Sequence, residues 1–145
     1  MIDALRDGAV WAVWSVVVGV SVHVIPRSCF ARDSWVTHIR TWENDGRVYE
    51  RLSIRRWKRR LPEVGGKRTL PASLDNLALE TRRAEYVHWT IASIAPLFAL
   101  WNAWSLTIAM FVYAIAANAP FIAVQRYNRA RVGRIIRHRV PTAIQ

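Results

Sequence analysis

Charged side chains are absent from residues 86–125, although the chain as a whole carries 21 Lys and Arg and 10 Asp and Glu. A second stretch with few charges covers residues 1–26, where only Asp3, Arg6 and Asp7 are charged. A charge at the centre of a bilayer costs about 2.5–3.5 kcal/mol on insertion scales, so membrane segments exclude charges in this way. A soluble domain would mix the two classes of residue, so the segregation predicts an all-α integral membrane protein.

We predict three transmembrane segments, one anchor followed by a helical hairpin. Residues 8–25 form an apolar run of about one bilayer thickness. A single helix over residues 87–124 would be about 57 Å long, roughly twice the hydrocarbon core, so this stretch must turn. The turn is expected at residues 101–104, where two Trp surround an Asn as in the aromatic belt of a membrane interface. The arms of the hairpin are then residues 87–101 and 105–124.

Basic residues predict the orientation of these segments. Residues 27–68 contain twelve Lys and Arg, and residues 126–145 contain six Arg and no acidic residue. By the positive-inside rule both blocks are cytoplasmic, which places the N-terminus outside a multi-pass protein of the cell membrane. Pro26 and Arg27, rather than small residues, follow the first segment, so we expect it to be retained and not cleaved. At 145 residues the chain is one membrane domain.

The block between the first and second segments, residues 27–72, is predicted to form basic amphipathic helices in the headgroup layer. In residues 47–61, Ile54, Trp57 and Leu61 recur at helical spacing among the basic residues Arg55, Arg56, Lys58, Arg59 and Arg60. Attraction to anionic lipid, about 1 kcal/mol per Lys or Arg, explains such a stretch, and a site for a phosphate or a coenzyme tail is the alternative. Pro and Gly-Gly within residues 62–66 are expected to end the element. A second group at helical spacing lies just upstream: Trp35, Ile39 and Trp42.

A polar cluster precedes the second membrane segment, within a helix predicted over residues 73–101. The candidate catalytic side chains in this cluster are Glu80, Arg82, Glu85 and His88. Glu85 and His88 are three residues apart and therefore neighbours on a helix surface. A carboxylate beside an imidazole orients the ring and raises its basicity, as a general base requires. Simple pairing of these charges with each other and with lipid phosphates is the alternative.

No metal site is predicted from this cluster. A di-iron bundle needs two Glu-x-x-His pairs and further carboxylates, whereas this chain has one pair and no acidic residue after Glu85.

A second polar cluster follows the last membrane segment. An Arg guanidinium presents a planar fork that suits a phosphate or a carboxylate. Because a hairpin returns to the interface at which it entered, we expect this cluster to lie near His88. The alternative is that the arginines are cytoplasmic anchors and that Asn118 packs between helices. The candidate substrate-binding residues are Trp57, Lys58, Asn118, Gln125, Arg126, Tyr127, Asn128 and Arg129.

Three blocks of residues resemble the bacterial glycosyl-4,4'-diaponeurosporenoate acyltransferase family, and together they cover about residues 35–131. The resemblance implies a membrane-bound acyltransferase that transfers a fatty acyl group to a hydroxyl of a glycolipid-like acceptor, such as a glycosylated carotenoid. The first block is Trp42-Glu43, Gly46, Tyr49-Glu50, Ile54, Trp57-Lys58, Leu61-Pro62-Glu63 and Gly65. The second is Glu80-Thr81-Arg82-Arg83-Ala84-Glu85 with His88-Trp89, and the third is Asn118, Pro120 and Gln125-Arg126-Tyr127-Asn128-Arg129.

The mechanism has to be built from this chain's own residues. Glycerolipid acyltransferases have a His-x-x-x-x-Asp motif, which is absent here because no acidic residue follows His88. A Gly-x-Ser-x-Gly elbow is also absent. We predict that His88, oriented by Glu85 or Glu80, takes a proton from a sugar hydroxyl, whose oxygen then attacks an acyl thioester. Arg82 or Arg126 and Asn128 are predicted to stabilise the oxyanion.

The expected partners are membrane lipids and a lipid-linked sugar acceptor, with no nucleic acid. We expect no bound cofactor, and acyl-CoA or another acyl thioester as the co-substrate, with its phosphates near Trp57 and Lys58. A homo-oligomer or a membrane-protein partner also fits. Two other functions stay open: a noncatalytic membrane subunit that binds lipid or partner helices, and another small lipid-modifying enzyme of the methyltransferase or reductase type.

Overall fold

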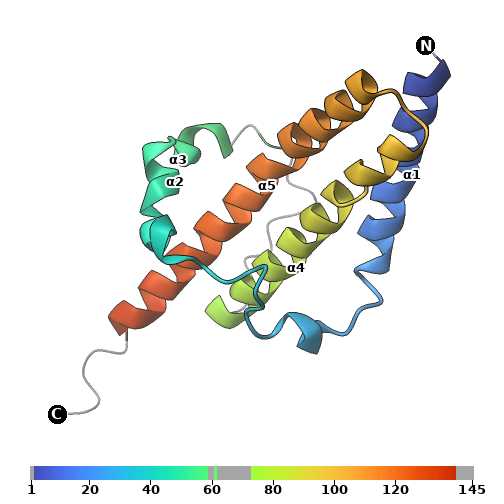
Figure 1. Ribbon diagram of the computed structural model, residues 1–145. Coiled ribbons are helices and arrows are strands. Elements are labelled where there is room, and N and C mark those ends of the chain that lie inside the picture. Colours follow the sequence, from blue (N-terminus) through green and yellow to red (C-terminus); the bar gives the residue numbers. More distant parts are fainter. Residues whose placement is uncertain (1, 59–60, 62–72, 140–145) are drawn as a thin grey trace.

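Three long helices lie side by side in the computed structural model, and short helical turns wrap around one end of them (Figure 1). The structure describes residues 2–58, 61 and 73–139. Helix α1 spans Ile2–Ser21, α4 spans Leu74–Ala92 and α5 spans Trp104–Arg139. The described residues form helices and loops without any strand, which confirms the predicted all-α class.

Helices α4 and α5 form the predicted hairpin, and the chain turns at residues 101–103. The first arm is not a straight helix to residue 101. It is α-helical only to Ala92, and a 3-10 helix, η4, follows over Ala95–Leu100. Pro96 lies in the first turn of η4, where its missing N–H is not needed, but it could not continue an α-helix.

A buried carboxylate and an apolar cluster hold α1 against the hairpin. Asp7 is fully buried and accepts hydrogen bonds from Trp101 Nε1 at 2.8 Å and from Asn102 Nδ2 at 2.6 Å. The side chains that the sequence assigned to an interfacial belt thus have a partner in α1. The apolar cluster beside this contact consists of Trp11, Ile94, Ala95, Phe98 and Ala114.

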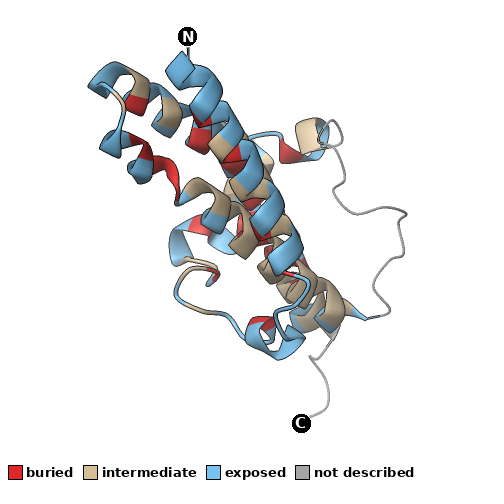
Figure 2. Cartoon of the chain, turned by 90° about the vertical axis from the view of Figure 1, so that its right-hand side faces the viewer, coloured by how far each residue is buried: buried red, intermediate tan, exposed pale blue. Residues whose placement is uncertain are grey.

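Within the described part of the chain, two helices are long and apolar enough to cross a bilayer, α1 and α5. Figure 2 shows that the outer side of α1 is exposed along its length. The second predicted segment, made of the end of α4 and of η4, does not meet the same measure, so the three-span topology stays a prediction. The exposed side chains on α1 and α5 include Val13, Val16, Val20, Ile108, Val112 and Ile115.

The prediction of one continuous amphipathic helix over residues 47–61 is wrong. Two short helices, α2 (Arg47–Arg51) and α3 (Ile54–Trp57), are separated by a break at which Ser53 has a φ of 55°. Ile54 is fully buried against Tyr49 and Tyr127, so the apolar face of this region packs on α5. The predicted end of the element at residues 62–66 lies outside the described residues.

The helix that the spacing of Trp35, Ile39 and Trp42 predicted is also absent from residues 35–42. Residues 35–37 form a turn, and the following 3-10 helix, η2, spans Thr41–Gly46. Trp35 and Trp42 are 80% and 64% exposed and pack on no common face. A further short 3-10 helix, η1, spans Arg27–Phe30 and leads the chain away from α1.

Gly46 lets the chain turn tightly against α5. Its φ is +84°, and a Cβ at this position would lie 2.9 Å from the Cβ of Ala130. We expect Gly46→Ala to lower the free energy of unfolding by about 1–3 kcal/mol, because it adds left-handed strain and an overlap with a helix. Thermal unfolding of the detergent-solubilised protein, followed by circular dichroism, measures this.

Gly19→Ala is the matched control for that substitution. A Cβ on Gly19 meets no described atom within 4 Å, and alanine is favoured over glycine inside a helix such as α1. Equal losses of stability in the two variants would contradict the expectation for Gly46.

Candidate functional site

A network of buried charges joins α4, α5, η2 and the segment before η2. Glu43 and Glu85 are fully buried, and Arg126 and Arg129 are only 8% and 4% exposed. Glu85 accepts hydrogen bonds from Arg126 Nη1 and from Arg129 Nη2, both at 2.6 Å. Glu43 accepts from Arg126 Nε at 3.1 Å and also from Arg126 Nη2. Two carboxylates therefore balance two guanidinium groups inside the protein.

Arg126 uses every donor that it has. A guanidinium carries five N–H groups and no acceptor. Besides the bonds to the two glutamates, Nη1 donates to the carbonyl oxygen of Val36 at 3.0 Å and Nη2 to that of His38 at 2.7 Å. With no donor left for an oxyanion, the geometry favours a structural role for Arg126, which ties the segment before η2 to α5.

Glu43 is held in its ionised form. It also accepts from the Tyr49 hydroxyl at 2.7 Å and from the backbone N–H of Arg40 at 2.7 Å. Burial raises the pKa of Glu43, but the hydrogen bonds from Arg126, Arg40 and Tyr49 outweigh it, so this pKa lies below its ordinary value. Burial, followed by the bond to Glu43, raises the pKa of Tyr49, which stays a neutral donor.

His88 and Asn118 meet across the hairpin. Asn118 Nδ2 donates to the carbonyl oxygen of Ala114 at 2.9 Å, so its Oδ1 is the atom that faces His88 Nδ1, at 3.0 Å. This pattern assigns the proton to Nδ1 and leaves a lone pair on Nε2. Phe121 stacks on the imidazole, with ring centroids 4.6 Å apart and planes 11° from parallel. Two side chains of α5 thus fix the ring in a form that can accept a proton.

The structure separates His88 from the acids that were predicted to orient it. The carboxylate of Glu85 binds Arg126 and Arg129, and Glu80 pairs with Arg27 at 2.7 Å. The sequence spacing placed Glu85 and His88 near each other on α4 but could not show what each faces. An amide from α5, not a carboxylate from α4, orients the imidazole.

Two of the predicted substrate-binding residues at the end of α5, Tyr127 and Asn128, contact α3 and its C-cap Lys58. Lys58 Nζ donates to Asn128 Oδ1 at 3.2 Å and lies 5.1 Å from the centre of the Tyr127 ring. Tyr127 is fully buried, Trp57 packs against the same cluster, and Gln125 is half-buried. These contacts join α3 to α5.

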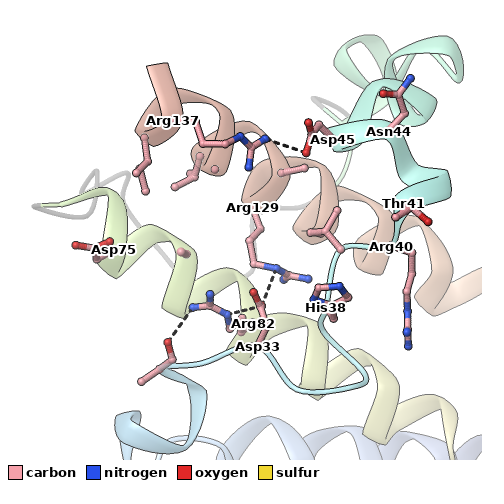
Figure 3. A pocket seen from close by; sticks show the side chains of 17 residues that line it. Asp33, His38, Arg40, Thr41, Asn44, Asp45, Asp75, Arg82, Arg129 and Arg137 are labelled. Atoms are coloured by element: carbon pink, nitrogen blue, oxygen red, sulfur yellow. Dashed lines mark hydrogen bonds and ion pairs between the residues drawn. The ribbon is translucent and has the colours of Figure 1, made fainter. Parts of the chain in front are cut away.

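A polar cavity of about 720 Å³ lies beside the buried network, between α4, α5 and residues 31–45 (Figure 3). Arg82 lines it and donates from Nε to Asp33 Oδ1 at 2.7 Å, while Arg129 enters it from α5. The sequence pointed to these two arginines. It missed Asp33, His38 and Arg40, because they lie in a loop without periodicity.

No cluster suited to a metal ion is found in residues 2–58, 61 and 73–139, where three or more His, Cys, Asp or Glu side chains would have to converge.

Comparisons with known proteins match this chain to acyltransferases. Residues 26–138 match the family described as glycosyl-4,4'-diaponeurosporenoate acyltransferase. A protein of that name from Staphylococcus haemolyticus is 31% identical over 141 residues, which cover 88% of this chain and 81% of the relative. Another, from Staphylococcus aureus strain N315, is 28% identical over 127 residues, or 78% of this chain and 75% of the relative. No solved structure matches the chain significantly.

Proposed function

The chain belongs to the glycosyl-4,4'-diaponeurosporenoate acyltransferase family, and on that premise we propose that it transfers a fatty acyl group from a thioester to a hydroxyl of a glycosylated isoprenoid lipid. The names of its relatives support an acyltransferase of carotenoid biosynthesis. The observation that carries the proposal is the His88–Asn118 pair, since it presents a lone pair on Nε2 as a general base for such a transfer requires.

The proposed reaction needs one base and one leaving thiol. His88 Nε2 takes the proton of the acceptor hydroxyl while the oxygen attacks the thioester carbonyl carbon. The C–S bond then breaks, and the imidazolium returns the proton to the departing thiolate. Asn118 keeps the second ring proton on Nδ1 throughout, which preserves the reactive tautomer.

The three predicted oxyanion donors do not lie beside the imidazole. Arg126 is fully occupied, and Arg82 is six residues from His88 on α4, about 9 Å along the helix axis, with its Nε bonded to Asp33. Asn128 is ten residues from Asn118 on α5, about 15 Å along the axis, and its Oδ1 accepts from Lys58. The proposed reaction therefore assigns no oxyanion donor to these residues.

We propose a membrane setting in which the acceptor's tail lies against α1 and the first half of α5. Exposed aliphatic side chains along both helices support this, because exposed apolar surfaces of that extent mark lipid or partner contacts. The basic end of the molecule, with residues 27–58 and the end of α5, would then face the cytoplasm.

Mass spectrometry of the host's lipids, with the gene intact and deleted, tests the function. We expect deletion to remove one acylated glycolipid and to let its unacylated precursor accumulate. Purified protein, given that precursor and an acyl thioester, should restore the product. A changed lipid profile without turnover by the purified protein would favour the noncatalytic-subunit alternative, and an unchanged profile would contradict the proposed function.

A further inference from the structure

The polar cavity beside α4 and α5 has a basic lining that the proposed reaction does not use. The lining contains three aspartates and four arginines, which come from α4, α5 and residues 33–45. Two of the aspartates are neutralised by ion pairs, Asp33 with Arg82 at 2.7 Å and Asp45 with Arg137 at 2.8 Å. The charged lining residues are Asp33, Asp45, Asp75, Arg40, Arg82, Arg129 and Arg137.

Arg129 is the innermost of these arginines and is incompletely bonded. It is 4% exposed, and its Nη2 donates to Glu85 and to the carbonyl oxygen of Thr37. Its Nε lies 3.5 Å from Asp33 Oδ1, outside good hydrogen-bonding geometry. Its Nη1 has no hydrogen-bond partner among the residues that the structure describes. A buried charged donor without a partner is costly, and a bound acceptor would remove that cost.

Figure 3 shows the guanidinium of Arg129 in the cavity wall, between the Arg82–Asp33 pair and His38. Arg40 lies on the other side of His38 and donates from Nη2 to the carbonyl oxygen of Trp35 at 2.7 Å. An anion placed here would accept from Arg129 Nη1, which lacks a partner among the described residues, and Arg40 is a further cation of the lining. Guanidinium groups favour oxyanions that accept through two oxygens, and a phosphate ester is the common biological example.

We propose that this cavity binds the phosphate ester of the acyl donor, an inference that rests on the proposed acyl transfer. Arg129 shares Glu85 with Arg126, and Glu85 is three residues from His88 on α4. Arg82, which lines the cavity, is six residues from His88, or about 9 Å along the helix axis. A donor whose phosphate sits in the cavity therefore needs an extended arm to carry its thioester to His88, as coenzyme A has.

This placement differs from the one that the sequence suggested. Trp57 and Lys58 do not line the cavity; Lys58 binds Asn128 and lies over the ring of Tyr127. The phosphate is accordingly assigned to Arg129 and its neighbours.

Binding of coenzyme A to the full-length protein in detergent, followed by isothermal titration calorimetry, tests the proposal. We expect Arg137→Gln and Arg40→Gln each to weaken binding by about 10-fold, the effect of one charge-assisted hydrogen bond. Arg129→Lys should weaken it at least as much, because lysine keeps the charge but loses the fork. Unfolding temperatures identify any variant that loses binding merely by losing its fold.

Arg131→Gln is the matched control, because Arg131 is an exposed arginine of α5 that does not line the cavity. Binding that survives in this variant but falls in the other three supports the site. No binding by the wild type, or equal loss in Arg131→Gln, would overturn it.

A second titration, with nanodiscs containing phosphatidylglycerol, separates a lipid headgroup from the acyl donor as the source of the phosphate. Lipid binding that depends on the same arginines, with no binding of coenzyme A, would overturn the assignment to the donor. These titrations contain no acceptor, so they do not depend on turnover. Binding without acyl transfer would overturn the proposed function alone, and transfer without binding would overturn this inference alone.

Discussion

His88→Ala is expected to lower the turnover of acyl transfer by about 10²–10⁴-fold, the usual contribution of a general base. The bond from Nδ1 to Asn118 leaves the lone pair on Nε2 of the imidazole available to accept a proton. The rate should be measured with purified protein, a glycolipid acceptor and an acyl thioester at saturating concentrations. Turnover near the wild-type rate would rule out His88 as the base.

His88→Gln separates the loss of the base from the loss of packing. Glutamine retains a polar group that can bond to Asn118 and fills more of the space beside Phe121 than alanine does, yet it cannot accept the proton. Equal loss of turnover in both variants, with unchanged unfolding temperatures, would identify chemistry as the cause. A glutamine variant with much higher turnover than the alanine variant would point to packing.

Arg126→Met is expected to lower the free energy of unfolding by about 3–5 kcal/mol, which is the effect of removing one partner from a buried ion pair. The substitution leaves Glu43 fully buried without its charged partner, and Glu85 keeps Arg129 as its charged partner. Thermal unfolding in detergent measures the loss. Arg134→Gln is the comparison, because it breaks a partly exposed pair with Glu50 and should cost only about 0–1 kcal/mol.

A double variant and a pH series check the cause. Glu43→Gln added to Arg126→Met should recover part of the stability, because it removes the unpaired charge. The pKa of Glu43 is lowered in the folded state, so its contribution is complete above the ordinary value near 4.5 and is lost as the pH falls through the folded value. Arg126→Met should make the free energy of unfolding depend less on pH over this acidic range. A loss no larger than that of Arg134→Gln would contradict the structural role of Arg126.

The hairpin was predictable because its cause is simple. An uncharged stretch too long for one crossing has to turn, and the Trp-Asn-Ala-Trp run marked where. The same reasoning brought the end of α5 back toward His88, and the bond between His88 and Asn118 agrees with that geometry. The catalytic roles of both residues remain predictions.

The buried network was not predictable in the same way. Periodicity shows which residues share a face of a helix but not what that face meets, so Glu85 was assigned to His88. Its actual partners are on α5. Glu43 reaches them from a segment in which Asn44 and Asp45 have φ values of 46° and 52°, a conformation without any sequence period. The apolar face of residues 47–57 was equally ambiguous, since lipid and a neighbouring helix select the same pattern.

The buried network also explains part of the resemblance to the family in structural terms. Many residues that carry the resemblance lie in the buried network or hold it in place: Glu43, Gly46, Tyr49, Glu85, Arg126 and Arg129. Such residues shape the fold around the site. His88, Asn118 and Arg82 are therefore the sharper targets for testing chemistry.

The carboxylate of Asp7 has a consequence for how the molecule is assembled. Its partners, Trp101 and Asn102, are made more than ninety residues later. If α1 enters the bilayer as proposed, it does so before the two hydrogen-bond donors of this buried acid have been made, with Arg6 Nε 3.9 Å from Asp7 Oδ1 as a charged neighbour. During synthesis α1 then lies in the membrane without these contacts, and its position is fixed only when the hairpin turn forms and donates to Asp7.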